Sequence, residues 1–474
     1  MISRRTWISR AALLAAGAAM LDRARLALGG GEALAQSPHA GHGQPAEPAP
    51  PPANQPAAPA ARHAANALPY TPVITPNVPT LPFRMNGGVK EFHLVAEPVE
   101  VEFAPGMKVK AWGYNGTSPG PTIEAVEGDR VRILVTNRLP EHTSVHWHGV
   151  FLPAGMDGVA GLNQPHIQPG ETYAYEFTLR QWGTQMYHPH ADEMVQMAVG
   201  MMGFFVIHPK RPENPPTDRD FCIFPHMWAI EPDTATPNPS VMLDFNLFTF
   251  NGRVFPGTEP MICRLNDRVR IRTANVSMTS HPLHIHGVRF WVTQTDGGPI
   301  PKSAWWPETS VNVAPGQTRA VEFIFDAPGD WIFHCHKTHH AMNAMGHDIP
   351  NVLGVDTRGV SDQIERLVSG YMTMGTTGMS EHAKHQQHMA GLPNTLPMMT
   401  GEGPFGPIEM GGMFTMFKVR AGLESYGDPG WYDNPAGTVA RKVETPEEPA
   451  NPPMKKPMEG MDHDHGGSGH GQND

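Results

Sequence analysis

The central part of the chain contains the same series of short motifs twice, in the same order. The sequence DRVRI begins at Asp129 and again at Asp267, and a histidine motif follows each copy after 17 positions: HWHGV at His146 and HIHGV at His284. Further on, QPGETYAYEFTL leads to MYHPH in the first copy, and APGQTRAVEFIF leads to IFHCH in the second. This repeat is longer than the unit of a solenoid, so we expect two homologous domains rather than a repeat array.

Short runs of alternating apolar and polar residues, separated by Gly, Pro and Asn turns, fill both copies. Examples are VRILVTN and TYAYEFTL in the first copy, and RVRIRTAN and AVEFIFD in the second. This alternation is typical of strands in a β-sandwich or barrel, and no long helical period interrupts it. The sequence therefore predicts an all-β protein with two domains, at residues 81–210 and 218–355.

The segments outside these domains have a different composition. Residues 1–35 contain the twin-arginine pattern SRRTWI, an apolar stretch and small residues at Ala33 and Ala35, which predicts a signal peptide for export to the bacterial periplasm or beyond. Charged residues interrupt the apolar run too early for a membrane span, so we expect no stable membrane anchor. We expect residues 36–80, rich in Pro and Ala, to be a disordered linker.

The last segment, residues 356–474, is rich in Met and His. We expect a mostly irregular C-terminal extension there, in which MFTMFKVR could add one strand to the second domain.

Charge and cysteine content exclude some classes of protein. The net charge is -11 and no basic run follows the predicted signal, so we expect no nucleic-acid partner. Three cysteines cannot form a disulfide framework in a chain of this length. Cys222 and Cys263 could form one bridge, but we expect two buried free thiols. Cys335 differs, because it lies in HCHKTHHAMNAMGH, among side chains that bind metals.

Each copy contains two HxH pairs. Side chains two positions apart in a strand point to the same face, so each pair can present two imidazoles to one place. Together the pairs supply eight imidazoles, from His146, His148, His188, His190, His284, His286, His334 and His336. A structural zinc site needs four ligands, so structural zinc does not account for this pattern.

Cys335 lies between His334 and His336 and therefore points to the opposite face of its strand. It could be joined there by His281, His340 and Met345. Two imidazoles, one thiolate and a weak axial thioether form a blue-copper electron-transfer site. Cys335 would then connect that copper covalently to metal ligands one residue away on either side.

With these motifs in this order, the chain resembles the multicopper oxidases, the family of laccases, bilirubin oxidases and copper-resistance oxidases. HWHG, HPH, HPLHIHG and HCHxxxHxxxxM match the family's copper motifs, and the resemblance covers residues 81–355. It implies two cupredoxin-like Greek-key β-sandwich domains and four copper ions per chain. By motif, it implies a type 1 copper on His281, Cys335, His340 and Met345, a type 2 copper on His146 and His284, and two type 3 coppers on His148, His188, His190, His286, His334 and His336.

The sequence departs from the three-domain members in two ways. Only 91 positions, from 190 to 281, separate the second motif from the third, so the middle domain is missing. Pro189 also stands where the second copy has Cys335, so we expect a type 1 copper in domain 2 alone. The nearby methionines are expected to belong to the core rather than to bind metal: Met194, Met197, Met201 and Met202.

One carboxylate is a candidate catalytic residue. Asp157 lies nine positions after His148, where the family places an acidic residue that helps to deliver protons to the oxygen site. In isolation, an Asp in PAGMDG is typical of a turn. Some members carry a second carboxylate directly after the histidine that matches His340, but this chain has Ala341 there. A second proton relay would then be absent or supplied elsewhere.

The resemblance implies an oxidoreductase that takes electrons from a small reductant at the type 1 copper and reduces O2 to water at a three-copper cluster. The reductant is expected to be a phenol or aromatic amine, or a metal ion such as Cu(I). Two-domain relatives close as trimers with one cluster at each interface, so we expect a homotrimer. Two alternatives remain: a copper-sequestering protein, which the Met/His-rich extension favours, and a copper nitrite reductase, against which Pro189 and the eight histidines argue.

Overall fold

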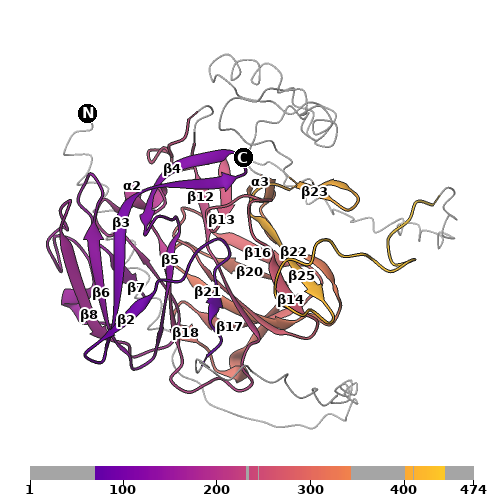
Figure 1. The fold of residues 1–474 in the computed structure, drawn as a ribbon, viewed down its shortest axis with the longest axis horizontal. Coiled ribbons are helices and arrows are strands. Elements are labelled where there is room, and N and C mark those ends of the chain that lie inside the picture. The colour runs from indigo at the N-terminus through magenta and orange to yellow at the C-terminus, as the bar shows by residue number, and fades with distance from the viewer. Residues whose placement is uncertain (1–69, 231–233, 244, 343–400, 409, 444–474) are drawn as a thin grey trace, which may run out of the picture. The chain divides into compact units, whose positions relative to one another are not determined.

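Strands make up nearly all the regular structure of the computed structural model, which describes residues 70–230, 234–243, 245–342, 401–408 and 410–443 (Figure 1). The helical elements there are short: α2 (Glu193–Ala198), α3 (Thr338–Met342), and the 3-10 turns η1 (Ala154–Met156) and η2 (Lys302–Ala304). The predicted all-β class is confirmed. Within the described ranges, no helix has the length and apolar character needed to cross a membrane. The predicted signal peptide lies outside these ranges.

Domain 1 consists of two sheets that share one core. The first has the strand order β2-β3-β6-β8, with β4 paired to β3, and the second has the order β5-β10-β9-β7. Alternate side chains of the RVRILVTN strand, β6, are buried in this core, as the sequence pattern predicts. The bounds are β2 (Phe83–Asn86), β3 (Val89–Ala104), β4 (Met107–Tyr114), β5 (Gly120–Val126), β6 (Arg130–Asn137), β7 (His146–His148), β8 (Thr172–Thr178), β9 (Gly183–His188) and β10 (Gly203–His208).

Domain 2 repeats this arrangement. Its first sheet has the order β1-β11-β15-β21-β17-β18, with β19 paired to β17, and its second has the order β14-β25-β22-β16-β20. The bounds are β1 (Val73–Ile74), β11 (Arg219–Ile223), β14 (Met261–Arg264), β15 (Arg268–Ala274), β16 (His281–Ile285), β17 (Phe290–Thr295), β18 (Gly298–Pro299), β19 (Trp306–Glu308), β20 (Ser310–Val313), β21 (Thr318–Ile324), β22 (Gly329–Cys335) and β25 (Phe414–Arg420). Two small pairs complete the set: β12 (Pro225–Trp228) with β13 (Leu247–Phe250), and β23 (Gly401–Gly403) with β24 (Gly406–Ile408).

The last strand of domain 2 comes from far along the chain. β25 pairs antiparallel with β22 and parallel with β14, just as β10 pairs with β9 and β5 in domain 1. Figure 1 shows it in yellow beside the earlier strands of this sheet. The strand expected at MFTMFKVR is thus confirmed, and domain 2 extends beyond the boundary expected at residue 355.

The segment before domain 1 is more ordered than the sequence predicts. The sequence predicts a disordered linker that includes residues 70–80, but β1 pairs with β11 of domain 2. The ring of Tyr70 also stacks on His208, with 3.7 Å between ring centroids. These contacts hold the segment against folded strands, so the expected linker is wrong for residues 70–80.

The two domains of one chain are in direct contact. Buried Arg272 of domain 2 donates a hydrogen bond to the hydroxyl of Thr184 in domain 1, at 2.9 Å, and forms an ion pair with Asp220. The Thr318 hydroxyl donates to the Thr184 carbonyl at 3.0 Å. The hairpin of β3 and β4 packs its apolar side chains against Trp228 and neighbouring residues of domain 2. The domains are therefore neighbours, as expected for a chain that lacks the middle domain.

Candidate metal centre

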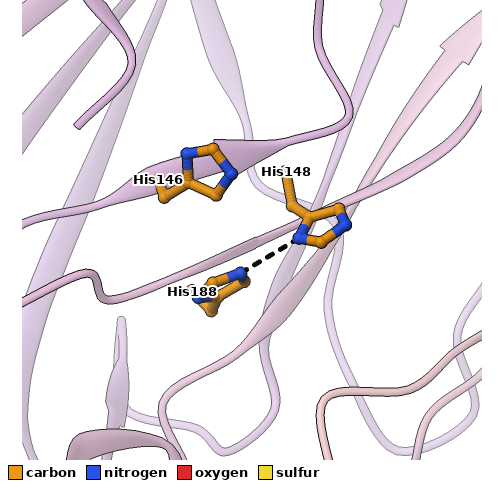
Figure 2. A group of neighbouring side chains, drawn as sticks. All are labelled: His146, His148 and His188. Carbon is orange, nitrogen blue, oxygen red and sulfur yellow. Dashed lines mark hydrogen bonds between the residues drawn. The ribbon is translucent and has the colours of Figure 1, made fainter. Parts of the chain in front are cut away.

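Paired strands bring the histidines of domain 1 together. β7 pairs antiparallel with β9, so that His146 lies opposite His188, while Trp147 points into the core and is fully buried. Figure 2 shows the rings of His146, His148 and His188 turned toward one another. The Nδ1 atom of His148 lies 3.2 Å from Nε2 of His188. His190, the fourth histidine, has its ring centroid 5.5 Å from that of His146.

The same register is found in domain 2. β16 pairs with β22, which places His284 opposite His334. Nε2 of His286 lies 3.3 Å from Nε2 of His334. The ring centroid of His336 lies 5.5 Å from that of His284. Each domain therefore holds a group of four imidazoles, as the HxH pairs predict.

Backbone carbonyls orient these rings. Nδ1 of His146 donates to the carbonyl of Asp157 at 2.8 Å, and Nδ1 of His284 donates to the carbonyl of Thr309 at 2.6 Å. His188 and His334 make the equivalent bond to the carbonyl of the residue that follows each of them. A proton held on Nδ1 leaves Nε2 free to bind a metal, and such bonds fix the tautomer.

A glycine follows the first HxH pair of each domain for a steric reason. Gly149 and Gly287 have φ angles of +80° and +78°, which favour glycine. A Cβ at Gly149 would lie 2.1 Å from Oε1 of Gln185, and a Cβ at Gly287 would lie 2.3 Å from the indole of Trp331. The glycine of HxHG thus lets the backbone turn directly after the second histidine, where a larger residue would collide with Gln185 or Trp331.

A second kind of donor group lies on the other face of β22. Cys335 Sγ is 3.8 Å from Nδ1 of His281 and 3.5 Å from Nδ1 of His340, and the two Nδ1 atoms are 3.2 Å apart. All three side chains are at most 2% exposed. The ring of Phe248 stacks on His340 at 4.4 Å between centroids. Met345, the expected fourth ligand, lies outside the described residues.

Burial sets the protonation state of these groups. It lowers the pKa of His188 to about 3, of His334 to about 4 and of His340 to about 3. These imidazoles are therefore neutral at pH 7, with a lone pair available for a metal. Burial also raises the pKa of the Cys335 thiol to about 11, so a metal would have to displace its proton.

Two carboxylates approach the histidines of domain 1. Asp157 ends the turn η1, and its Oδ1 lies 3.5 Å from Nδ1 of His146. It is both a turn residue and a neighbour of the cluster. Glu193, which the sequence analysis did not single out, has its carboxylate oxygens 3.8 Å from Nδ1 of His188 and 3.8 Å from Nε2 of His190. Its place three positions after His190, at the start of α2, was the available signal.

The methionines and the other cysteines partly follow the expectation. Met201 and Met202 are fully buried in the core, as predicted. The prediction of a core position is wrong for Met194, whose side chain is 57% exposed on α2. Cys222 and Cys263 are buried free thiols.

The donor atoms suit copper. Three groups have ligand atoms within 4.8 Å of one another: His146, His148 and His188; His284, His286 and His334; and His281, Cys335 and His340. Imidazole nitrogen and thiolate sulfur are ligands of copper or zinc, whereas calcium and magnesium prefer oxygen. Two imidazoles with one thiolate is the ligand set of a blue-copper site. The arrangement can therefore hold an electron-transfer metal next to a multi-histidine metal site.

Comparisons with known proteins point to the same chemistry. Two family models, each described as multicopper oxidase, match residues 96–212 and residues 231–352, about half of the chain together. The solved structure of a multicopper oxidase named mgLAC is 33% identical, with a TM-score of 0.50; the match covers 53% of this chain and 80% of that one.

Two curated relatives are also similar to the chain. A probable nitrite reductase–hydroxylamine oxidoreductase fusion protein of Kuenenia stuttgartiensis is 27% identical over 360 residues, which are 73% of this chain and 39% of that protein. Copper resistance protein A of Escherichia coli is 41% identical over 126 residues, which are 27% of this chain and 20% of that protein. The matches thus span less than half the length of these relatives.

Proposed function

The chain belongs to the multicopper oxidases, and from this premise we propose that it couples one-electron oxidation of a small reductant to reduction of O2 to water. The observation that carries the proposal is the end of β22, where Cys335 belongs to one donor group and the adjacent His334 belongs to another. Neighbouring residues of one strand thus join a blue-copper ligand set to a multi-histidine set. Copper bound at both places would supply the redox chemistry.

We assign four copper ions to each chain, following the family motifs. The type 1 copper would bind His281, Cys335 and His340, and Met345, outside the described residues, would complete the family's ligand set. The type 2 copper would bind His146 and His284. The two type 3 coppers would bind His148, His188, His190, His286, His334 and His336.

The residues around these ligands have supporting roles. The Asp157 carbonyl accepts from Nδ1 of His146 and so leaves Nε2 free to bind a metal, and the Asp157 carboxylate is 35% exposed beside the same ring. We propose that this carboxylate passes protons from solvent to the oxygen site. The ring of Phe248 and the surrounding core keep water away from His340 and Cys335.

A complete cluster would need two copies of the chain. In the part of the chain that the structure describes, no imidazole of the domain 1 group contacts one of the domain 2 group. His188 and His334 are buried, but the other imidazoles of each group are partly exposed, and His336 is exposed. We propose that domain 1 of one chain meets domain 2 of the next, and that the oligomer closes as a homotrimer.

We propose that the enzyme works outside the cytoplasm, in the periplasm or beyond, because the sequence SRRTWI predicts twin-arginine export. The reductant would then be a phenol, an aromatic amine or a metal ion such as Cu(I).

The proposed function is tested by loading the purified protein with copper. We expect an intense blue absorption, four coppers per chain and O2 uptake when a diphenol or Cu(I) is added. Binding of copper without O2 uptake for any of these reductants would instead support a copper-sequestering protein.

A nitrite reductase is the second candidate, because a relative with that printed name matches 73% of this chain. Pro189 and the two groups of four imidazoles argue against a type 1 site in domain 1 and for a larger cluster. Anaerobic incubation of the copper-loaded protein with nitrite and a reductant distinguishes a nitrite reductase from an oxidase. We expect no nitrite consumption there, and O2 uptake once air is admitted.

A further inference from the structure

A hollow of about 600 Å³ lies at the end of domain 1 that is opposite to its histidines. Three segments contribute to its wall: the turn between β5 and β6, residues 179–182 between β8 and β9, and residues 209–213, which lead from β10 toward domain 2. β9 runs from this wall, at Gly183, to His188, and a strand of that length spans roughly 17–20 Å. The hollow is therefore separate from the metal ligands.

Three cations of this wall have no ion pair. Arg180, Lys210 and Arg211 line the hollow with exposed side chains, and none of them forms an ion pair with any residue that the structure describes. Arg180 belongs to domain 1, whereas Lys210 and Arg211 begin the segment that leads to domain 2. Cations from two separate segments thus gather around one hollow.

The two carboxylates of the wall do not neutralise these cations. Glu213 accepts two hydrogen bonds from buried Arg270 of domain 2, at 2.7 and 2.8 Å, so its charge is already matched. Glu127 is the other acid of the wall, and it accepts a long hydrogen bond, 3.4 Å, from the backbone of Lys210. The hollow therefore has an excess of positive charge in a chain whose net charge is -11, which indicates a place for an anion.

The second copy of the repeat shows that the fold does not require these cations. β9 and β10 of domain 1 correspond to β22 and β25 of domain 2, and each pair starts from a glycine in the same register. By this alignment the cations correspond to residues without positive charge: Asp326 for Arg180, Gly422 for Lys210 and Leu423 for Arg211. Both copies form the same two sheets, so the three cations are available for a role outside the fold.

The wall suits an anion that has an aromatic body. Arginine presents a planar fork of N–H donors that binds a carboxylate through two hydrogen bonds, and Arg180 and Arg211 supply two such forks. Trp182 and Pro209 add apolar surface, and an indole ring can stack on an aromatic ring. The volume lies within the range of small-molecule sites, roughly 300–1,000 Å³, and exceeds the roughly 150 Å³ of a cavity that binds benzene.

We propose that this hollow is a binding site for an aromatic carboxylate, with Arg180 and Arg211 on the carboxylate and Trp182 against the ring. The ligand contacts both domain 1 and the segment that leads to domain 2, so its binding stabilises the connection between them. No bond of the ligand is made or broken in this site. The inference does not depend on the proposed oxidase function.

Calorimetry with 2-naphthoate tests the site, and the uncharged 2-naphthamide shows what the carboxylate contributes. Both probes are titrated into the copper-loaded full-length protein and into Arg180→Gln/Arg211→Gln, whose changed side chains are exposed. Arg138→Gln/Arg441→Gln is the matched control, because it removes two exposed arginines that do not line the hollow.

We expect one 2-naphthoate to bind to each chain of the wild type and of the control. The Kd should rise by roughly tenfold or more in Arg180→Gln/Arg211→Gln, because hydrogen bonds to an ionised carboxylate are lost. The wild type should bind 2-naphthamide more weakly by a similar factor. Absence of 2-naphthoate binding to the wild type, or equal affinity in Arg180→Gln/Arg211→Gln, would overturn the proposal.

Thermal unfolding and competition give further readouts. We expect 2-naphthoate to raise the Tm of the wild type and the control, and to leave that of Arg180→Gln/Arg211→Gln nearly unchanged. Inorganic phosphate should compete poorly, since it has no ring to place against Trp182. Displacement of 2-naphthoate by an equal concentration of phosphate would show a general oxyanion site and would overturn the aromatic class of ligand.

Oxidase assays separate this inference from the proposed function. Turnover of a diphenol should be equal in Arg180→Gln/Arg211→Gln and the wild type, because neither arginine is near a metal ligand. A fall in that turnover would contradict the separation of the hollow from the metal site. Absence of O2 uptake in the wild type would refute the oxidase, while the calorimetry would still decide whether the hollow binds an aromatic carboxylate.

Discussion

Cys335 belongs to one donor group through its side chain and is bonded through its backbone to a member of the other. We therefore predict that Cys335→Ser removes the blue absorption and the oxidase turnover, because serine oxygen cannot replace the thiolate of a blue-copper site. His334 points to the other face of this strand and the domain 1 group belongs to another sheet, so both groups of imidazoles should still load copper. Absorption spectra, copper analysis and O2 uptake check the result. A blue band that persists in the variant would show that another residue supplies the thiolate.

Asp157 contacts His146 through its backbone carbonyl and through its carboxylate, and one substitution distinguishes the two contacts. Asp157→Asn keeps the carbonyl that accepts from His146 and removes the ionisable carboxylate. We expect reoxidation of the reduced enzyme by O2 to slow by roughly a hundredfold, while reduction of the type 1 copper by substrate keeps its rate. Stopped-flow measurement of the two half-reactions tests this, at equal copper content. Equal rates in variant and wild type would leave Asp157 a turn residue alone.

Single residues show where sequence reasoning succeeds and where it stops. The period of two in a strand was enough to place His146 with His148 and to put Cys335 on the opposite face. The carbonyl of Thr309 carries no such signal, because folding brings it to His284 from 25 residues away.

At the scale of elements, β25 is the strand on which the second sheet of domain 2 depends. It lies between β14 and β22, and the fully buried ring of Phe417 contacts Phe323, Phe325 and Phe333. We predict that Phe417→Ala lowers the free energy of unfolding by about 3–5 kcal/mol, because it leaves a cavity among aromatic rings. Urea denaturation measures the change.

A matched control is available for this prediction. Phe405 is 77% exposed, so Phe405→Ala should change the stability by no more than about 0.5 kcal/mol. Similar losses in the two variants would contradict a core role for β25. The Met/His-rich extension therefore cannot be studied by truncation before residue 414, since that would remove a strand next to the one that carries Cys335.

The sequence predicted most of the strands but not the contacts that join the two domains. The alternating pattern of VRILVTN and RVRIRTAN identified β6 and β15, because one face of each is buried in its domain core. The pairing of β1 with β11 and the packing of the β3–β4 hairpin on Trp228 were not predicted. Both depend on contacts between distant segments, for which a single sequence gives no periodic signal.

At the scale of the whole molecule, the position of the two histidine groups is the basis of the proposed assembly. Within one chain, Arg272 and Thr318 of domain 2 donate hydrogen bonds to Thr184 of domain 1. In that arrangement the two groups of imidazoles remain separate, and each has members that are partly or fully exposed. A head-to-tail contact between copies would bring the domain 1 group of one chain to the domain 2 group of the next. In a closed ring of copies, every domain 1 group would then face a domain 2 group.

We therefore predict that the copper-loaded protein is a homotrimer, with a mass by light scattering of three chains. Complementation tests the shared site more sharply. The variant His188→Ala/His190→Ala removes two ligands from the domain 1 group, and His284→Ala/His286→Ala removes two from the domain 2 group. Each variant should therefore be inactive alone. When the two are co-expressed, random mixing gives about a quarter of the interfaces two intact groups, and turnover should recover to about that fraction. In a site closed within one chain, no mixture could recover activity, and a fully active monomer with all its coppers would exclude the trimer directly.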